Sequence, residues 1–93
     1  MKLSQEQLDK ISEYAGLFLS PREIACLMGL DFELFKESLF DGNHPASMAY
    51  LSGKIQSKYE IRKKVIDLAK KGSPQAEALA DKYIEEQSLM EDE

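Results

Sequence analysis

Apolar residues recur every three or four positions along most of the chain, which is the spacing of one face of an α-helix. The first such series is Leu8, Ile11, Tyr14, Ala15 and Phe18, and we expect the helix that carries it to have one buried side and to end near Gly16. No stretch alternates between apolar and polar residues as a half-buried β-strand does. The pattern therefore predicts an all-α protein.

Two of the predicted helices begin with a capping box, in which a serine and the residue three positions later each accept a hydrogen bond from the other's backbone N–H. Ser4 is followed by Gln7 in this way, and Ser20 is followed by Glu23. Pro21 stands at the first helical position, where no hydrogen-bond donor is missed. We therefore expect helices to begin after Ser4 and after Ser20.

The stretch LSPREIACLMGL, residues 19–30, predicts a helix from Pro21 to Met28 that ends in a tight turn. Gly29 allows a backbone conformation that a residue with a Cβ atom resists, and Asp31 is suited to cap a second helix over Phe32–Phe40. The expected inward positions of the two helices are Ile24, Leu27, Met28, Leu34, Phe35 and Leu39.

This helix pair has the pattern of a helix-turn-helix motif. Counting Pro21 as the first position, Ile24 and Ala25 fall where the motif has an apolar residue followed by a small one. Ala25 lets the two helices cross closely, and Phe35 anchors the second. A plain helical hairpin has the same apolar periodicity without binding DNA, and it stays open as the alternative.

The chain from Pro45 to Lys71 predicts one long helix, because it holds a single glycine, Gly53, and no further proline. About 27 helical residues would span about 40 Å. Its apolar positions form two neighbouring stripes, one of Leu51, Ile55, Tyr59, Ile66 and Ala69 and one of Tyr50, Ile61, Val65 and Leu68. This band is wider than one partner helix covers, so we expect self-association above a dimer.

Gly72-Ser73-Pro74 ends the long helix and starts a last one, which we expect to pack on the long helix as an antiparallel hairpin. Three segments follow from this pattern. A helix-turn-helix unit of three helices occupies residues 1–44, an oligomerising long-helix hairpin occupies 45–88, and a disordered acidic tail occupies 89–93.

The net charge of −5 is distributed unevenly along the chain. Residues 1–53 carry four basic and eight acidic side chains, residues 54–71 carry seven basic and two acidic, and residues 72–93 carry one basic and seven acidic. Such segregation favours contact between the basic segment and a polyanion or an acidic neighbour.

Candidate DNA contacts lie in that basic segment. Lys54, Lys58 and Arg62 recur at four-residue steps and so form one basic face of the long helix, which Lys63 and Lys64 widen. The alternative is that these cations pair with acids of neighbouring helices, in the same chain or in another copy.

The second helix of the motif is acidic for a helix that reads DNA. Its expected outward residues are Phe32, Glu33, Lys36, Glu37 and Phe40, of which only Lys36 suits a phosphate or a guanine edge. Glu33 and Glu37 have the wrong sign for a duplex, so specific base recognition is not favoured.

The sequence predicts no catalysis, no cofactor and no metal site. His44 is the single histidine and lies in a turn before Pro45, and no CxxC, HxxxH, P-loop or GxSxG spacing occurs. The carboxylates of Glu33 and Glu37 lie one helical turn apart, an arrangement more typical of a solvated face than of a metal site.

Cys26 has no second cysteine to pair with, and its position on the apolar side of its helix predicts a small buried side chain. This favours a reducing, cytoplasmic location. The N-terminus MKLSQEQLDK lacks the apolar run of a signal peptide, and no segment approaches the roughly 20 apolar residues of a membrane span, so no membrane contact is expected.

Two stretches resemble the small subunit of phage terminases, the DNA-recognition component of the genome-packaging motor. They are LSPREIACLMGLDFELF and AYLSGKIQSKYEIRKKVIDLAKKGSPQAEALADKYI, which contain the helix-turn-helix pattern and an alanine-bearing last helix. Similar signatures occur in homeodomain-like regulators.

The resemblance implies an N-terminal unit that binds double-stranded DNA, a central hairpin that forms a homo-oligomeric ring, and a C-terminal segment that engages a large ATP-hydrolysing subunit. The DNA contacts that it implies are Arg22 and Lys36 in the motif, with Lys54, Lys58, Arg62 and Lys63 as further candidates on the long helix. The alternatives are a helical protein-interaction module without DNA binding, and a helix-turn-helix transcription regulator.

Overall fold

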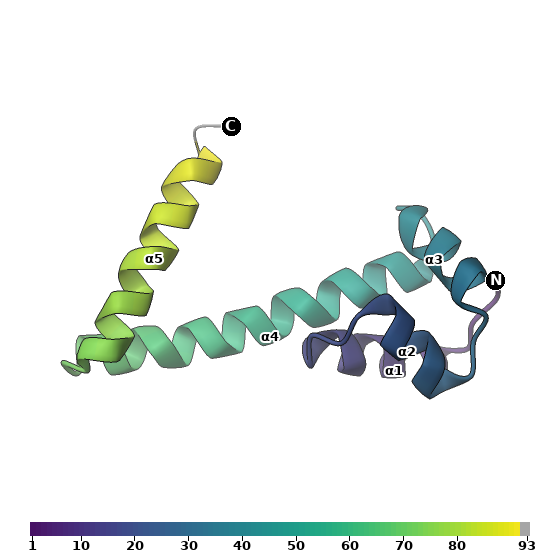
Figure 1. Cartoon of the computed structure of the whole chain (residues 1–93), viewed down its shortest axis with the longest axis horizontal. Helices are drawn as coiled ribbons and strands as arrows, with labels where there is room; N and C mark the ends of the chain where they lie inside the picture. The colour runs from purple at the N-terminus through teal and green to yellow at the C-terminus, as the bar shows by residue number, and fades with distance from the viewer. Residues whose placement is uncertain (92–93) are drawn as a thin grey trace. The chain divides into compact units, whose positions relative to one another are not determined.

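The computed structural model describes residues 1–91 and has five α-helices and, within that range, no β-strand (Figure 1). The helices are α1 (Gln5–Gly16), α2 (Pro21–Met28), α3 (Phe32–Phe40), α4 (Pro45–Lys70) and α5 (Pro74–Glu91). The all-α prediction is confirmed. The bounds expected for the helices after Ser4, Ser20, Asp31 and His44 are confirmed to within one residue.

The chain divides into two compact units, Met1–Lys58 and a second unit that starts at Tyr59. The first contains α1, α2, α3 and the first part of α4, and the second contains the rest of α4 and α5. The sequence predicted a division after residue 44, in the loop before α4, which keeps that helix within one unit. In the structure the division falls within α4, after Lys58.

The helix starts are fixed by the side chains that the sequence indicated. Ser4 Oγ accepts a hydrogen bond from Gln7 N at 3.1 Å, and Gln7 Oε1 accepts one from Ser4 N at 2.9 Å. Ser20 and Glu23 repeat this exchange at 3.2 and 2.9 Å. These interactions satisfy backbone donors that the first turn of a helix leaves without partners.

The turn between α2 and α3 depends on Gly29 and Asp31. Gly29 adopts the left-handed conformation, with φ 68° and ψ 30°, which carries little cost only for a residue without a Cβ atom. Asp31 Oδ1 accepts a hydrogen bond from Leu34 N at 3.0 Å and so caps α3. The helix, turn and helix expected over residues 19–40 are therefore present.

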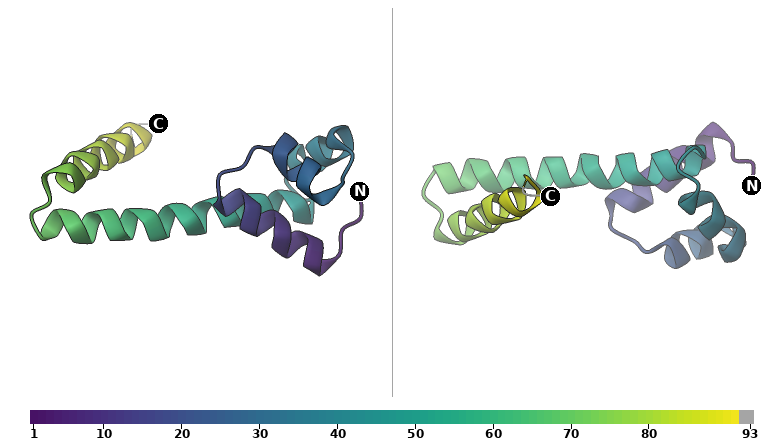
Figure 2. Two further views of the ribbon diagram at one scale, coloured as in Figure 1. Left: turned by 60° about the horizontal axis from the view of Figure 1, so that its bottom comes forward. Right: turned by 90° about the horizontal axis from the view of Figure 1, so that it is seen from above.

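The core of the first unit lies among α1, α2, α3 and the start of α4 (Figure 2). Its buried residues are Ile11, Ala15, Ile24, Ala25, Phe35 and Ala46. Ala25 is 2% exposed where α2 and α3 meet, which is the close packing expected of a small residue at that position.

Gly53 brings α4 against α1. A Cβ atom built on Gly53 overlaps the carbonyl oxygen of Ser12, so no larger residue fits there without moving a backbone. Ser57 Oγ, one turn further along α4, donates a hydrogen bond to Gly16 O at 2.6 Å. The two helices therefore meet at backbone distance.

Four side chains that we expected to face the core are exposed. Phe18, beyond the end of α1, is 54% exposed, Leu27 is 61% exposed, Leu34 is 51% exposed and Cys26 is also exposed. In α2 the buried direction is set by Ile24 and Ala25, and neighbouring positions of a helix turn by about 100° per residue, which carries Cys26 and Leu27 away from the core. The same geometry in α3 buries Ser38 beside Phe35 and turns Leu34 outward.

The second unit is held by contacts of Arg62 on α4 with α5. The Arg62 guanidinium carbon lies 4.1 Å from the centre of the Tyr83 ring, and Nη2 donates to Glu86 Oε2 at 2.8 Å. The helix α5 runs through Glu91, and so includes three residues of the segment 89–93 that was expected to be disordered. The last two of those five lie outside the described residues.

Candidate functional site

A groove on the first unit brings together the two cations that the sequence singled out in the helix-turn-helix pattern. Its volume is about 530 Å³. Its walls come from the start of α2, from α3 and from α4, and are formed by Ser20, Pro21, Arg22, Phe32, Lys36, Leu39, Phe40 and Tyr50. The groove is thus mostly apolar and aromatic, with Arg22 and Lys36 as its two charged residues.

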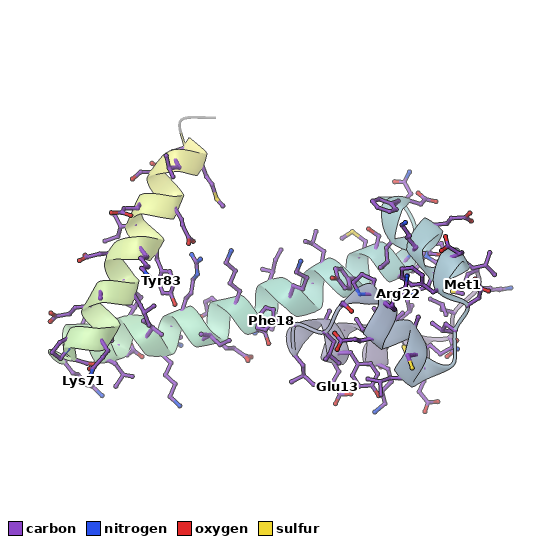
Figure 3. All side chains as sticks on the ribbon, in the orientation of Figure 1. Met1, Glu13, Phe18, Arg22, Lys71 and Tyr83 are labelled. Atoms are coloured by element: carbon purple, nitrogen blue, oxygen red, sulfur yellow. The ribbon has the colours of Figure 1, made fainter. Side chains whose placement is uncertain are left out.

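The sequence around Ser20 positions Arg22. The capping box fixes the first turn of α2, and Arg22 follows Pro21 in that turn. Figure 3 labels Arg22 on this unit. Its guanidinium carbon lies 4.2 Å from the centre of the Phe32 ring on α3, a cation–π contact that orients the charge while leaving the side chain exposed. Arg22 is therefore held at the groove with its donors accessible.

The acid next to Arg22 is committed to the helix cap. The Ser20 backbone N–H donates to the Glu23 carboxylate, and this hydrogen bond, with a smaller contribution from the Ser20 hydroxyl, lowers the pKa of Glu23 below its ordinary value. Glu23 thus stays ionised as a capping group. It is not among the residues that line the groove.

Lys36 supplies the second cation from the middle of α3. Its side chain is exposed, and no ion pair within residues 1–91 involves it. Glu33, three residues before Lys36, and Glu37, one residue after it, do not line the groove. The groove walls therefore carry positive charge only.

The first part of α4 carries Lys54 and Lys58. Lys54 Nζ lies 5.2 Å from the centre of the Tyr50 ring, and Tyr50 in turn lines the groove. Lys58 is exposed and forms no ion pair with any residue from 1 to 91. Both side chains are accessible to a partner.

Arg62 and Lys63 belong to the second unit. Arg62 is engaged by Glu86 and Tyr83, so for this residue the structure has the intramolecular acid pairing that we gave as the alternative to phosphate contact. Lys63 Nζ lies 5.9 Å from the centre of the Tyr59 ring. Both line a shallower hollow of about 410 Å³ with Tyr59, Ile66, Asp67 and Lys70.

His44 acts as a cap for α4. Its Nδ1 accepts a hydrogen bond from Ala46 N at 3.0 Å, and its Nε2 lies 2.7 Å from the carbonyl oxygen of Met1. Since Nδ1 accepts, Nε2 carries the proton and donates to that carbonyl. Among residues 1–91, no three histidine, cysteine or acidic side chains are grouped as a metal site requires.

Sequence reasoning missed the aromatic part of the groove. Phe32 was expected to face outward, yet it is half-buried beneath Arg22, and Tyr50 was assigned only to an apolar stripe of α4. The four-residue step from Tyr50 to Lys54 was a usable signal for their contact. The pairing of Arg22 with Phe32 had no such signal, because it depends on how α2 and α3 cross.

Comparisons with protein-family models, with curated proteins and with solved structures found no match to this chain. Within residues 1–91, no helix has the length and apolar character needed to cross a bilayer.

Proposed function

We propose that this protein is a non-enzymatic, double-stranded-DNA-binding protein of the phage terminase small-subunit type. In this proposal it assembles as a homo-oligomer and works with a large ATP-hydrolysing subunit. The observation that carries the proposal is the groove in which Arg22 and Lys36, from the two helices of the helix-turn-helix pattern, lie on one surface without an acidic wall residue.

The local geometry of α2 and α3 supports a helix-turn-helix function. A left-handed glycine at Gly29, a buried alanine at Ala25 and a three-residue turn between the helices are features of that motif. In the proposal, Arg22 and Lys36 contact backbone phosphates, for which the planar guanidinium fork of Arg22 is well suited.

The acids of α3 limit what such a motif can read. Glu33 and Glu37 are exposed on the helix that would enter the major groove, and their charge opposes phosphate. We therefore propose binding through the DNA backbone with little sequence preference. Lys54 and Lys58 remain candidates beside the groove, whereas Arg62 is the weakest candidate because Glu86 neutralises it.

Titration of the protein into duplex DNA at two salt concentrations tests the proposal. Replacing Arg22 and Lys36 by glutamine should reduce the slope of log affinity against log salt by about 0.9 for each lost phosphate contact. The matched control replaces Lys2 and Lys82, which are exposed and lie outside the groove, by glutamine. No DNA affinity in the native protein, or an equal change in both variants, would contradict the proposal.

A protein-interaction module is the second candidate, and the pairing of Arg62 with Glu86 favours it. The apolar walls of the groove are also suited to an apolar peptide with acidic residues. Under this alternative the same titration gives no DNA affinity at either salt concentration. A transcription regulator, in contrast, would bind as a dimer to paired half-sites.

A further inference from the structure

One face of α3 combines acidic and apolar side chains that nothing in the first unit covers. Glu33, Leu34 and Glu37 lie on this face, and none of them lines the groove. Leu34 is 51% exposed, and neither glutamate forms an ion pair within residues 1–91. An exposed leucine beside two carboxylates one helical turn apart is a surface that fits an apolar and basic partner.

The first part of α4 carries a face of the opposite charge. Leu51, Lys54, Ile55 and Lys58 follow one another at steps of three, one and three residues, which places them on one side of the helix. Leu51 is 51% exposed and Ile55 is 56% exposed. Gly53, which contacts α1, lies on the other side, so this face is left without a partner.

We propose that the α3 face of one copy of this chain packs against the α4 face of a second copy. The two glutamates are four residues apart, and so are the two lysines, so both charge pairs can form in one helix-to-helix contact. Leu34 then meets Leu51 and Ile55 beside the charges. The inference rests on the homo-oligomer of the proposed function. It withdraws Lys54 and Lys58 from the candidate DNA contacts and leaves Arg22 and Lys36 available to DNA.

A second copy of this chain, with its unlike face, fits the two faces better than nucleic acid or a pairing of like faces. Nucleic acid on the α4 face would leave Leu51 and Ile55 against phosphate, and it would be repelled by the α3 face. Two α4 faces packed on each other would bring lysine against lysine. Contact between unlike faces also accounts for the acids on α3, since Glu33 and Glu37 then select a partner subunit. In that contact Lys54 and Lys58 bind carboxylates in place of phosphates.

A charge-swap experiment on the full chain, without DNA, tests the inference by sedimentation velocity over a range of protein concentrations. Glu33→Lys with Glu37→Lys should raise the dissociation constant of self-association about tenfold or more, and so should Lys54→Glu with Lys58→Glu. An equimolar mixture of the two variants should regain association, because each reversed face then meets a complementary face on the other variant. The variant that carries all four substitutions should regain association by itself, without a second variant in the solution.

The matched control is Glu77→Lys with Asp81→Lys, which makes the same charge change at the same spacing on exposed positions of α5. It should leave self-association within about twofold. Circular dichroism checks that each variant keeps its helices. A monomeric native protein, a mixture that stays dissociated, or an equal effect of the control would overturn the inference.

The outcome is separable from that of the DNA titration. Glu33→Lys with Glu37→Lys keeps Arg22 and Lys36, so its monomer should still bind DNA, and the two added cations should strengthen rather than weaken that binding. Restored assembly in the mixture together with no DNA affinity would end the proposed DNA function and leave this interface standing. DNA binding by the native protein, together with no restored assembly in the mixture, would end this interface and leave the proposed DNA function standing.

Discussion

The two units of the chain use similar apolar periodicity in different ways. In Met1–Lys58 the pattern produces a core, in which Ile11, Ile24 and Phe35 are fully buried. In the second unit, among the residues described up to Glu91, Ala76 alone is buried, while several large apolar side chains are exposed. They are Tyr59, Ile61, Leu68, Leu79, Ile84, Leu89 and Met90.

The comparison teaches that four helices crossing at small residues can enclose a core that two helices cannot. In the first unit Ala25 and Gly53 let backbones approach, so Phe35 and its neighbours are enclosed from several sides. In the second unit the contacts of Arg62 with Tyr83 and Glu86 join the helices at one level. Helices that bury so few side chains are marginal in water, so we expect this unit to depend on association.

The largest expected effect breaks the core of the first unit. Phe35→Ala should lower the free energy of unfolding by about 3–5 kcal/mol, because Phe35 is fully buried and the surrounding helices cannot close the cavity. Ile84→Ala, at a site 60% exposed in the second unit, should change it by less than about 0.5 kcal/mol. Urea unfolding followed by circular dichroism measures both.

This pair of variants also probes the second unit at two protein concentrations. A loss at Ile84 that appears only at high concentration would show that self-association buries the side chain. A loss as large as that of Phe35→Ala at low concentration would contradict the contrast between the two units.

A smaller effect is expected at the contact between α1 and α4. Gly53→Ala should destabilise the first unit by about 1–3 kcal/mol, because the added Cβ atom overlaps the Ser12 carbonyl oxygen. The change removes a glycine from a helix interior, which alone would stabilise by about 1 kcal/mol. A destabilised variant therefore isolates the cost of the close approach.

Gly42→Ala is the control for this prediction, because a Cβ atom at Gly42 has nothing within 4 Å. Thermal unfolding should leave that variant near the native midpoint. If Gly53→Ala were as stable as the native protein, α1 and α4 would have to be further apart than they are here.

Local signals explain why the helix bounds were predictable from the sequence. Ser4 with Gln7 and Ser20 with Glu23 act within one turn, so a capping box gives the same result whatever the rest of the fold does. The role of Gly53 was not read in this way, although a glycine in the middle of a long helix is itself a sign of close packing.

The inward faces of α2 and α3 were only partly predictable. Helices of eight and nine residues have about two turns, so an apolar residue such as Leu27 or Leu34 fits the stripe by periodicity and still points outward. The candidate site shows the same limit. Lys36 stood out by its charge and Arg22 came from the family resemblance, whereas the groove between them depends on the crossing of α2 and α3.

The smallest expected effect concerns acid and distinguishes the helix starts of the two units. In the first unit Glu23 completes the capping box of α2, whereas α5 in the second has only the Ser73 hydroxyl, 3.4 Å from Ala76 N. Because the Ser20 backbone N–H donates to it, the pKa of Glu23 lies below its ordinary value in the folded protein. Its contribution to stability is therefore complete above the ordinary carboxyl pKa of about 4.3 and is lost as the pH falls through the lowered value.

Amide hydrogen exchange and chemical shifts at Ser20 between pH 5 and pH 2 measure this loss, which should appear at the start of α2 and be absent at the start of α5. Glu23→Gln supplies the control, since Gln7 fills the same role in α1 without titrating, and this variant should keep the cap and lose its pH dependence. Glu23→Ala should lose the cap at every pH. If Glu23→Gln showed the same acid transition as the native protein, a group other than Glu23 would be titrating. The starts of α2 and α5 would then not differ in their response to acid through Glu23.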